Sequence, residues 1–299
     1  MSPRAETDEV ARWAFPDHDP RSPAVAAHWL ALERTLTLLD QALPCAGVLV
    51  KGAALALTVY GSPHDRPMSD IDVLVPFSDV ERARNALVAN GFRPVTTSRP
   101  LSQLHLDVKL LAPMAAVSVL VELHGSIDKV ASRRIDYAAI FRRAMPLTGM
   151  ARLATPCPED HVVLVALHLG GDEFKHRPGF ADVALLLARG ADVDTIVERA
   201  RVWKASTVVG LAFDMLDEMF PGIVPARAVG AIRTRSARRR LLRRWFAPPL
   251  GATQPRALGL PWIARQTLLR DDLPAWGLGL ARYGGKRVLE RFFVKSSGR

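Results

Sequence analysis

The chain has 299 residues, 49% of them hydrophobic, and a formal net charge of +10, a composition that excludes a disordered or fibrous protein. No apolar run approaches the roughly 18 residues of a membrane helix, and no secretory-type segment opens the chain, so we expect a soluble cytoplasmic protein without a membrane span. The two cysteines, Cys45 and Cys157, are far apart in sequence and support neither a disulfide framework nor a cysteine-based zinc site.

The first half of the chain alternates between helix and strand patterns. We expect a helix over residues 23–43, where apolar side chains recur on one face, and a short buried strand over 46–50. A second helix is expected over 53–60. The prolines and glycine of residues 61–67 then require a loop.

The next segments complete a sheet. Residues 70–75 (DIDVLV) predict a strand, and residues 78–89 predict an amphipathic helix that Asn90-Gly91 ends. Two further strands, over 104–111 and 116–123, form a plausible hairpin. The first half of the chain is therefore expected to form a mixed sheet with flanking helices.

Helix patterns dominate after residue 156. Helices are expected at 159–169, 180–189, 193–203 and 206–219, and further helices around 225–246 and 279–293. The segment 146–158, rich in proline, marks the boundary between the two halves of the chain.

Positive charge is concentrated in the last third of the chain. Residues 201–299 hold 19 Lys and Arg against 6 Asp and Glu, whereas residues 1–200 hold 21 against 24. The run from Arg233 to Arg244 contains seven arginines and precedes Trp245. Such a run is typical either of a solvated helix face or of a surface that binds nucleic acid.

Two acidic residues share one face of a predicted strand. Because side chains alternate along a strand, Asp70 and Asp72 point to the same side. Neighbouring carboxylates repel each other, and this cost is relieved by divalent cations that prefer oxygen ligands, of which Mg²⁺ is the natural candidate.

A third acid interrupts an apolar strand. Glu122 lies inside VSVLVELHGSI, where a buried strand would otherwise continue. If this strand pairs with residues 70–75, Glu122 completes a three-carboxylate cluster. Such a cluster can hold two metal ions about 3.5 to 4 Å apart, the spacing used in phosphoryl chemistry.

These residues together resemble a known family. Lys51-Gly52, a helix, an arginine-containing loop, Asp-x-Asp and a later acid before Leu-His are similar to the uncharacterised nucleotidyltransferases of the DNA polymerase β-like superfamily. The resemblance is strong over residues 46–127 and weaker to Asp182. It implies an α+β fold in which a mixed sheet with flanking helices is followed by a helical C-terminal region.

The resemblance also implies a division into domains. An N-terminal helical segment, residues 1–44, would pack on a nucleotidyltransferase catalytic domain, residues 45–150. Residues 151–299 would form a helical domain with a basic C-terminal third.

Site roles follow from the same resemblance. Asp70 and Asp72 would bind two Mg²⁺ ions, and Glu122 would bind the catalytic one and help deprotonate an acceptor hydroxyl. Lys51, Gly52 and Arg66 would face the triphosphate, with glycine letting the backbone approach the phosphates. The wider superfamily usually has Gly-Ser or Gly-Gly at this turn, whereas this chain has Gly52-Ala53, which lacks the hydroxyl.

The remaining polar residues of interest lie outside this set of assigned roles. His124 shares a strand face with Glu122 and either orients a metal ligand, contacts the acceptor or is an ordinary core histidine. Asp182 meets the cleft by resemblance only. His168, Asp172 and His176 recur every four residues, but Gly170-Gly171 is expected to break their helix, so a zinc site is not predicted.

Two functions compete at this level. The first is a Mg²⁺-dependent nucleotidyltransferase of the EC 2.7.7 type, which binds ATP or another nucleoside triphosphate and transfers its nucleoside monophosphate to an acceptor hydroxyl, releasing pyrophosphate. The acceptor is left open among RNA, protein, peptide and small molecule. The alternative is a non-catalytic module that binds nucleic acid through the arginine-rich C-terminal third.

Overall fold

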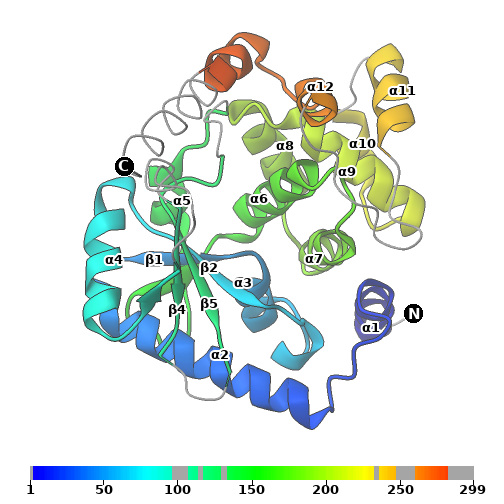
Figure 1. Ribbon diagram of the computed structural model, residues 1–299. Helices are drawn as coiled ribbons and strands as arrows, with labels where there is room; N and C mark the ends of the chain where they lie inside the picture. The colour runs from blue at the N-terminus through cyan, green and yellow to red at the C-terminus, as the bar shows by residue number, and fades with distance from the viewer. Residues whose placement is uncertain are drawn as a thin grey trace.

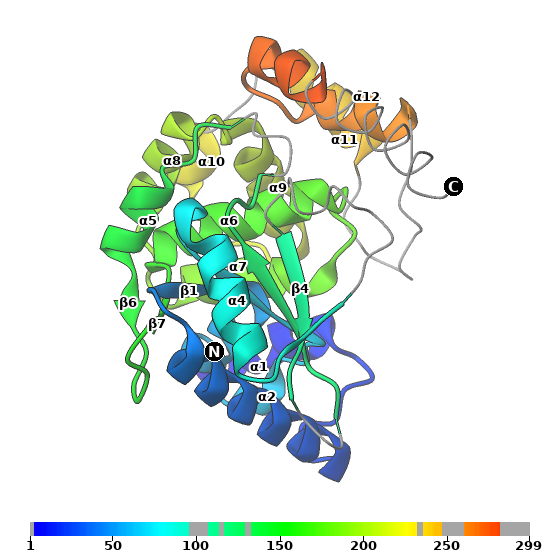
Figure 2. The same cartoon turned by 60° about the vertical axis from the view of Figure 1, so that its left-hand side comes forward.

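The chain folds as a mixed sheet with helices on both faces, followed by a helical region (Figures 1 and 2). The structure, a computed structural model, describes residues 3–95, 107–113, 117–128, 133–231, 236–246 and 260–281. This architecture confirms the α+β class expected from the sequence.

Seven strands of the described residues form one sheet in the order β3-β4-β5-β2-β1-β7-β6. The strands are β1 (Gly47–Val50), β2 (Asp70–Leu74), β3 (Arg93–Pro94), β4 (Asp107–Leu111), β5 (Leu120–His124), β6 (Met145–Pro146) and β7 (Leu153–Thr155). β2 pairs with β5 and β1 with β7 in parallel, while the other neighbours are antiparallel. The predicted hairpin is confirmed by the antiparallel pairing of β4 with β5.

The α-helices of the described part of the chain form two groups, one before and one after residue 150, and the second group forms a layer beside the sheet. The first group is α1 (Pro3–Ala14), α2 (Pro23–Ala42), α3 (Lys51–Thr58), α4 (Val80–Ala89) and α5 (Tyr137–Arg143). The second group is α6 (Pro158–Gly171), α7 (Arg177–Ala188), α8 (Val193–Val202), α9 (Ser206–Met219), α10 (Ala226–Ala231), α11 (Ser236–Trp245) and α12 (Leu260–Leu268). Short 3-10 helices, η1 (Pro63–Asp65) and η2 (Phe77–Asp79), precede β2 and α4 respectively.

The two faces of the sheet bury different cores. Ile71 and Val73 of β2 belong to a core with apolar residues of α2 and α4. Leu74, which points to the other face, belongs with Val48 to a larger core built mainly by α6, α7 and α9. The same alternation places Asp70 and Asp72 on the face that is turned toward the helical region.

The sheet extends slightly beyond the predicted catalytic segment. Residues 146–158 were expected to be a linker, but β6 and β7 occupy part of them, and β7 pairs with β1 at the centre of the fold. A chain rich in proline can still add short strands at the edge of a sheet. The division into domains at residue 150 stays a prediction, and the sheet itself continues to Thr155.

One predicted helix break is wrong. Gly170-Gly171 was expected to end the helix after Leu169, yet α6 continues through both glycines. A Cβ atom at Gly170 would lie 2.4 Å from Cγ2 of Val208, so glycine here permits close packing of α6 on α9. The local cost of glycine in a helix is outweighed by this tertiary contact.

The C-terminal expectations are tested only in part. Two helices, α10 and α11, replace the single helix expected around 225–246, with residues 232–235 outside the described part of the chain. Residues 273–281 are helical, whereas 282–293 of the expected helix 279–293 lie outside that part.

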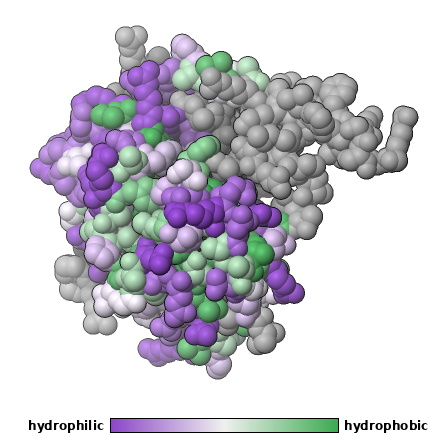
Figure 3. Space-filling model, turned by 90° about the vertical axis from the view of Figure 1, so that its left-hand side faces the viewer, coloured by the Kyte–Doolittle hydropathy of each residue, from purple (hydrophilic) through white to green (hydrophobic). Residues whose placement is uncertain are grey.

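The exposed surface is mixed in polarity. Hydrophilic and hydrophobic side chains alternate over the face of the molecule seen in Figure 3. Among the residues described, no helix combines the length and the apolar character needed to cross a bilayer.

Candidate active site

Three carboxylates lie on one face of the sheet. In the parallel pairing of β2 with β5, Asp72 stands directly opposite Glu122, and Asp70 precedes Asp72 by two residues on the same face. The sequence predicted that these acids converge if the two strands pair, and the register supplies that pairing. Their catalytic role stays a prediction.

Asp72 is the most enclosed of the three acids. It is 4% exposed and accepts two hydrogen bonds of 2.7 Å on Oδ1, one from the Lys51 ammonium and one from Nε2 of His124. Burial alone would raise the pKa of Asp72, but the bond from His124 and the charge of Lys51 outweigh it and hold this pKa well below its ordinary value. His124 therefore positions and stabilises the Asp72 carboxylate.

Glu122 has its own cationic partner. Lys109 of β4 lies opposite Glu122 in the antiparallel register, and its ammonium forms an ion pair with the Glu122 carboxylate. Sequence reasoning missed Lys109. The available signal was a lysine between Val108 and Leu110, two apolar residues of the strand, where an uncompensated charge would be costly.

The pKa of Asp70 is shifted in the opposite direction from that of Asp72. Burial, followed by the negative charges of Asp72 and Glu122, raises the pKa of Asp70 above its ordinary value. The group of three acids is thus under-neutralised at Asp70, although Lys51 and Lys109 offset part of the charge. A cation bound beside Asp70 would offset this repulsion.

The pKa of Asp70 is raised and that of Asp72 is lowered, so replacing each by asparagine should change stability in opposite directions. Because the folded pKa of Asp70 lies above its unfolded value, the charged form destabilises the fold, and Asp70→Asn should raise the melting temperature of metal-free protein at pH 7. Asp72, whose folded pKa is lowered, contributes stability above its unfolded pKa, so Asp72→Asn should lower that temperature.

Thermal melts in a chelator between pH 7 and pH ~4 would test this pair. The difference in melting temperature between Asp70→Asn and wild type should shrink at the acid end of the range, because the wild-type Asp70 takes up a proton there. A melting temperature of Asp70→Asn below that of wild type at pH 7 would contradict the proposed repulsion.

Lys51 and Gly52 form the sharp turn from β1 into α3. Lys51 has φ of 58°, a left-handed conformation that costs a non-glycine residue about 1 kcal/mol or more. Its ion pair with Asp72 is the contact that accompanies this strain. A Cβ atom on the buried Gly52 would lie 3.3 Å from Cβ of Met68, so the glycine keeps this turn close to the 61–68 loop.

Arg66 binds the helical region rather than pointing to solvent. Its Nε and one Nη each donate a 2.9 Å hydrogen bond to the Asp182 carboxylate of α7, and both side chains are more than nine-tenths buried. Tyr60 donates to the same carboxylate at 2.8 Å. Despite burial, which alone would lower it, the Asp182 charge raises the pKa of Arg66. The role of Arg66 at a triphosphate stays a prediction.

His161 is a buried, neutral histidine beside this pair. It is 1% exposed on α6, and its Nε2 has no hydrogen-bond partner among the described residues. Burial lowers the pKa of His161 from 6.5 to about 4, although the charge of Asp182 acts in the other direction.

Acid should therefore destabilise the fold through His161. Its stabilising effect is complete above the unfolded pKa of 6.5 and is lost as pH falls toward the folded pKa of about 4, because only the unfolded chain takes up the proton. We expect a loss of about 3 kcal/mol across that range. Urea unfolding at a series of pH values should show a weaker acid dependence of stability for His161→Leu than for wild type. Equal slopes for wild type and His161→Leu would contradict the assignment.

A small pocket lies beside the loop of residues 61–68 that carries Arg66. It has a volume of about 220 Å³ and lies between α2 and residues 63–68, with Trp29, Leu32 and Met68 among its lining side chains. Its walls are held by hydrogen bonds from His18 to the carbonyl of His64 and from His28 to the carbonyl of Met68.

The arginine-rich segment is partly used within the fold. Arg239 and Arg243 of α11 form ion pairs with Asp214 and Glu218 of α9, and Arg238 donates to two backbone carbonyls. Arg240 and Arg244 are exposed beside Trp245. Residues 233–235 of the run lie outside the described part of the chain. Three arginines of the run therefore hold α11 to neighbouring parts of the fold, a role that neither interpretation of the run included.

The comparison with known families adds an independent finding. A family model described as "Uncharacterised nucleotidyltransferase" matches residues 24–221, well over half of the chain. The matched segment runs from α2 through α9 and contains all the site residues described above. No curated protein matches the chain.

Proposed function

The chain belongs to the uncharacterised nucleotidyltransferase family, which supports nucleotidyl transfer as its general function, and from this premise we propose a specific reaction. The protein transfers the nucleoside monophosphate of a nucleoside triphosphate to an acceptor hydroxyl, and Asp70, Asp72 and Glu122 hold the Mg²⁺ that this reaction needs. The observation that carries the proposal is the in-register pairing of Asp72 with Glu122 on the same sheet face as Asp70.

The donor set fits Mg²⁺. Three carboxylates on adjacent strands supply the oxygen ligands that this ion prefers, and burial together with the charges of Asp72 and Glu122 raises the pKa of Asp70, a cost that a bound cation would relieve. When bound, a pair of Mg²⁺ ions would stabilise the charge that develops on the attacking and leaving oxygens.

The protein's own groups complete the site. The turn at Lys51-Gly52 opens α3, whose first backbone N–H groups and helix dipole favour a phosphate group placed there. Lys51 is 27% exposed at the edge of the acid cluster, so its ammonium can neutralise phosphate charge as well as Asp72. Ala53 lacks a hydroxyl, and we therefore assign phosphate recognition at this turn to backbone and lysine groups.

The reaction balances without any further reactant. The acceptor oxygen forms a bond to the α-phosphorus while the bond from that phosphorus to the pyrophosphate oxygen breaks. The acceptor proton must leave as the new bond forms. Glu122 is the carboxylate that we assign to receive it, and Lys109 keeps this carboxylate on the sheet face.

The direct test uses purified protein, Mg²⁺ and each α-labelled nucleoside triphosphate in turn, with lysate of the host as a source of acceptor. We expect label to enter one class of lysate molecule, with pyrophosphate released in equal amount, and both signals to disappear in a chelator. Failure of every nucleoside triphosphate to be consumed under these conditions would contradict the proposal.

A further inference from the structure

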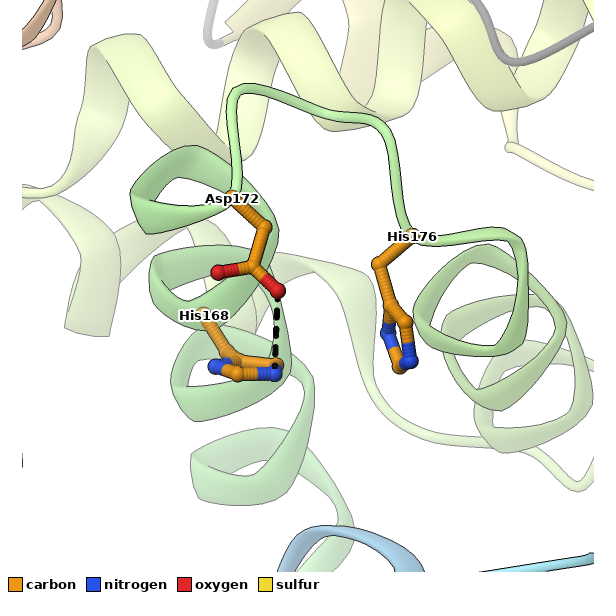
Figure 4. A group of neighbouring side chains, drawn as sticks. All are labelled: His168, Asp172 and His176. Carbon is orange, nitrogen blue, oxygen red and sulfur yellow. Dashed lines mark ion pairs between the residues drawn. The ribbon is translucent and has the colours of Figure 1, made fainter. Parts of the chain in front are cut away.

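A second group of metal-ligating side chains lies where α6 ends and α7 begins. His168 and Asp172 are four residues apart at the end of α6, and His176 directly precedes α7 (Figure 4). One ligand atom from each of the three lies within 4.8 Å of the others. None of the three belongs to the acid cluster of the sheet.

The backbone that joins them is held by buried anchors. Glu173 and Phe174 both adopt the left-handed conformation, with φ of 56° and 59°. Phe174 is completely buried and packs against Phe180 and Phe246, while the Glu173 carboxylate forms an ion pair with Arg265. Tertiary contacts therefore enforce the strained turn that brings His176 back toward α6.

The spacing of the side chains suits a transition-metal ion. Nε2 of His168 and Oδ2 of Asp172 are 3.5 Å apart, longer than a good hydrogen bond. Two ligands bound tetrahedrally at zinc distances of about 2.0 to 2.1 Å lie about 3.4 Å from each other. The imidazoles of His168 and His176 meet edge to face, with centroids 5.6 Å apart.

The state of His176 is a second, independent observation. Its Nδ1 is buried and has no hydrogen-bond partner among the described residues, a condition that normally calls for an explanation. A bound ion would account for a polar histidine kept in this position. The partial exposure of His168, whose side chain is 31% accessible, leaves a route for an ion to enter.

We propose that His168, Asp172 and His176 bind one divalent ion of the zinc class, through side chains other than the three carboxylates of the sheet. Two imidazoles and one carboxylate match zinc, whereas Mg²⁺ prefers oxygen ligands alone. Three protein ligands leave a fourth position for water or another small ligand. The ion ties the end of α6 to the start of α7, the helix that carries Asp182.

Metal binding by the full chain tests the site without reference to catalysis. Metal-free protein is titrated with Zn²⁺ by calorimetry and with Co²⁺ by visible absorption, which reports a low-symmetry coordination sphere. We expect one equivalent of Zn²⁺ to bind the wild type and to raise its melting temperature. His168→Gln, Asp172→Asn and His176→Gln should each weaken binding by more than the roughly 10- to 100-fold lost with an outer ligand partner.

Matched controls separate this site from others. The double variant Asp70→Asn/Asp72→Asn and the variant His28→Gln should keep the wild-type affinity and stoichiometry. Because Asp172→Asn preserves side-chain shape, its melting temperature without metal should stay near that of wild type, so that lost binding reports a lost ligand. The proposal would be overturned if wild type binds no Zn²⁺ at micromolar concentration, or if the double variant His168→Gln/His176→Gln still binds it. It would also be overturned if Asp70→Asn/Asp72→Asn loses the one bound Zn²⁺ ion.

Discussion

Asp72→Asn is expected to reduce nucleotidyl transfer by at least about 10³-fold, because the carboxylate is central to the proposed Mg²⁺ site and its loss removes several kcal/mol of transition-state stabilisation. Asparagine keeps the shape of the side chain and can still accept from Lys51 and His124, so the loss should appear in kcat more than in folding. Pyrophosphate release under saturating Mg²⁺ would measure it.

The control for this result is an aspartate of the same kind on the surface. Asp194 of α8 is 70% exposed and pairs with Arg227 only at 3.7 Å, so Asp194→Asn should keep full activity. Asp70→Asn should lose activity as Asp72→Asn does, while melting at a higher temperature. Full activity of Asp72→Asn would refute the assignment of the site, even if a nucleoside triphosphate is consumed by wild type.

The largest expected effect on stability belongs to the pair between Arg66 and Asp182. Asp182→Asn leaves a buried guanidinium with no compensating charge, and such a loss costs about 3 to 5 kcal/mol. The Tyr60 hydroxyl also loses its charged acceptor. Urea unfolding should therefore show a much lower midpoint for Asp182→Asn than for wild type.

Two comparisons make this prediction specific. Replacing both partners, as in Arg66→Met/Asp182→Leu, should recover a large part of the loss because no charge is then left buried. Glu198→Gln breaks an exposed pair with Arg201, both side chains being more than half exposed, and should change stability by less than about 0.5 kcal/mol. A cost for Asp182→Asn as small as that for Glu198→Gln would show that the buried pair does not hold α7 to the loop.

The two assignments can be tested independently. Asp72 belongs to the sheet and Asp182 to the helical region, and the ion pair of Arg66 with Asp182 is one of the contacts between these regions, beside their shared apolar core. If Arg66 only joins them, Arg66→Lys should lower stability and activity together. If it also binds phosphate, KM for the nucleoside triphosphate should rise beyond what the loss of folded protein explains.

Short stretches of sequence predict most of the local elements and the face on which Asp70 and Asp72 lie. Period-two alternation in DIDVLV predicts that Asp70 and Asp72 share a face, and apolar spacing predicts α2, α4 and α6 to α9 within a few residues. These features depend on neighbours along the chain. Their information is therefore contained in short windows of sequence.

Contacts between residues that are distant in sequence depend on the folded chain. The register that sets Asp72 opposite Glu122 and Lys109 opposite Glu122 depends on strand pairing across the sheet. The packing of α7 beside the 61–68 loop brings Arg66 into a buried pair with Asp182, a contact that the sequence did not predict, while the role of Arg66 at a triphosphate stays a prediction. Such contacts are set by the burial of whole faces and not by local propensity.

At Gly170, local propensity and tertiary packing favour different structures. In sequence, two glycines predict a helix end, because glycine costs a helix conformational entropy. In the fold, Gly170 lets α6 approach Val208 of α9, and the continued helix sets Asp172 one turn beyond His168. The sequence shows only that His168 and Asp172 are four residues apart. Their neighbouring positions on one helix depend on the packing of α6 on α9, because the close approach of two backbones is a property of the folded core.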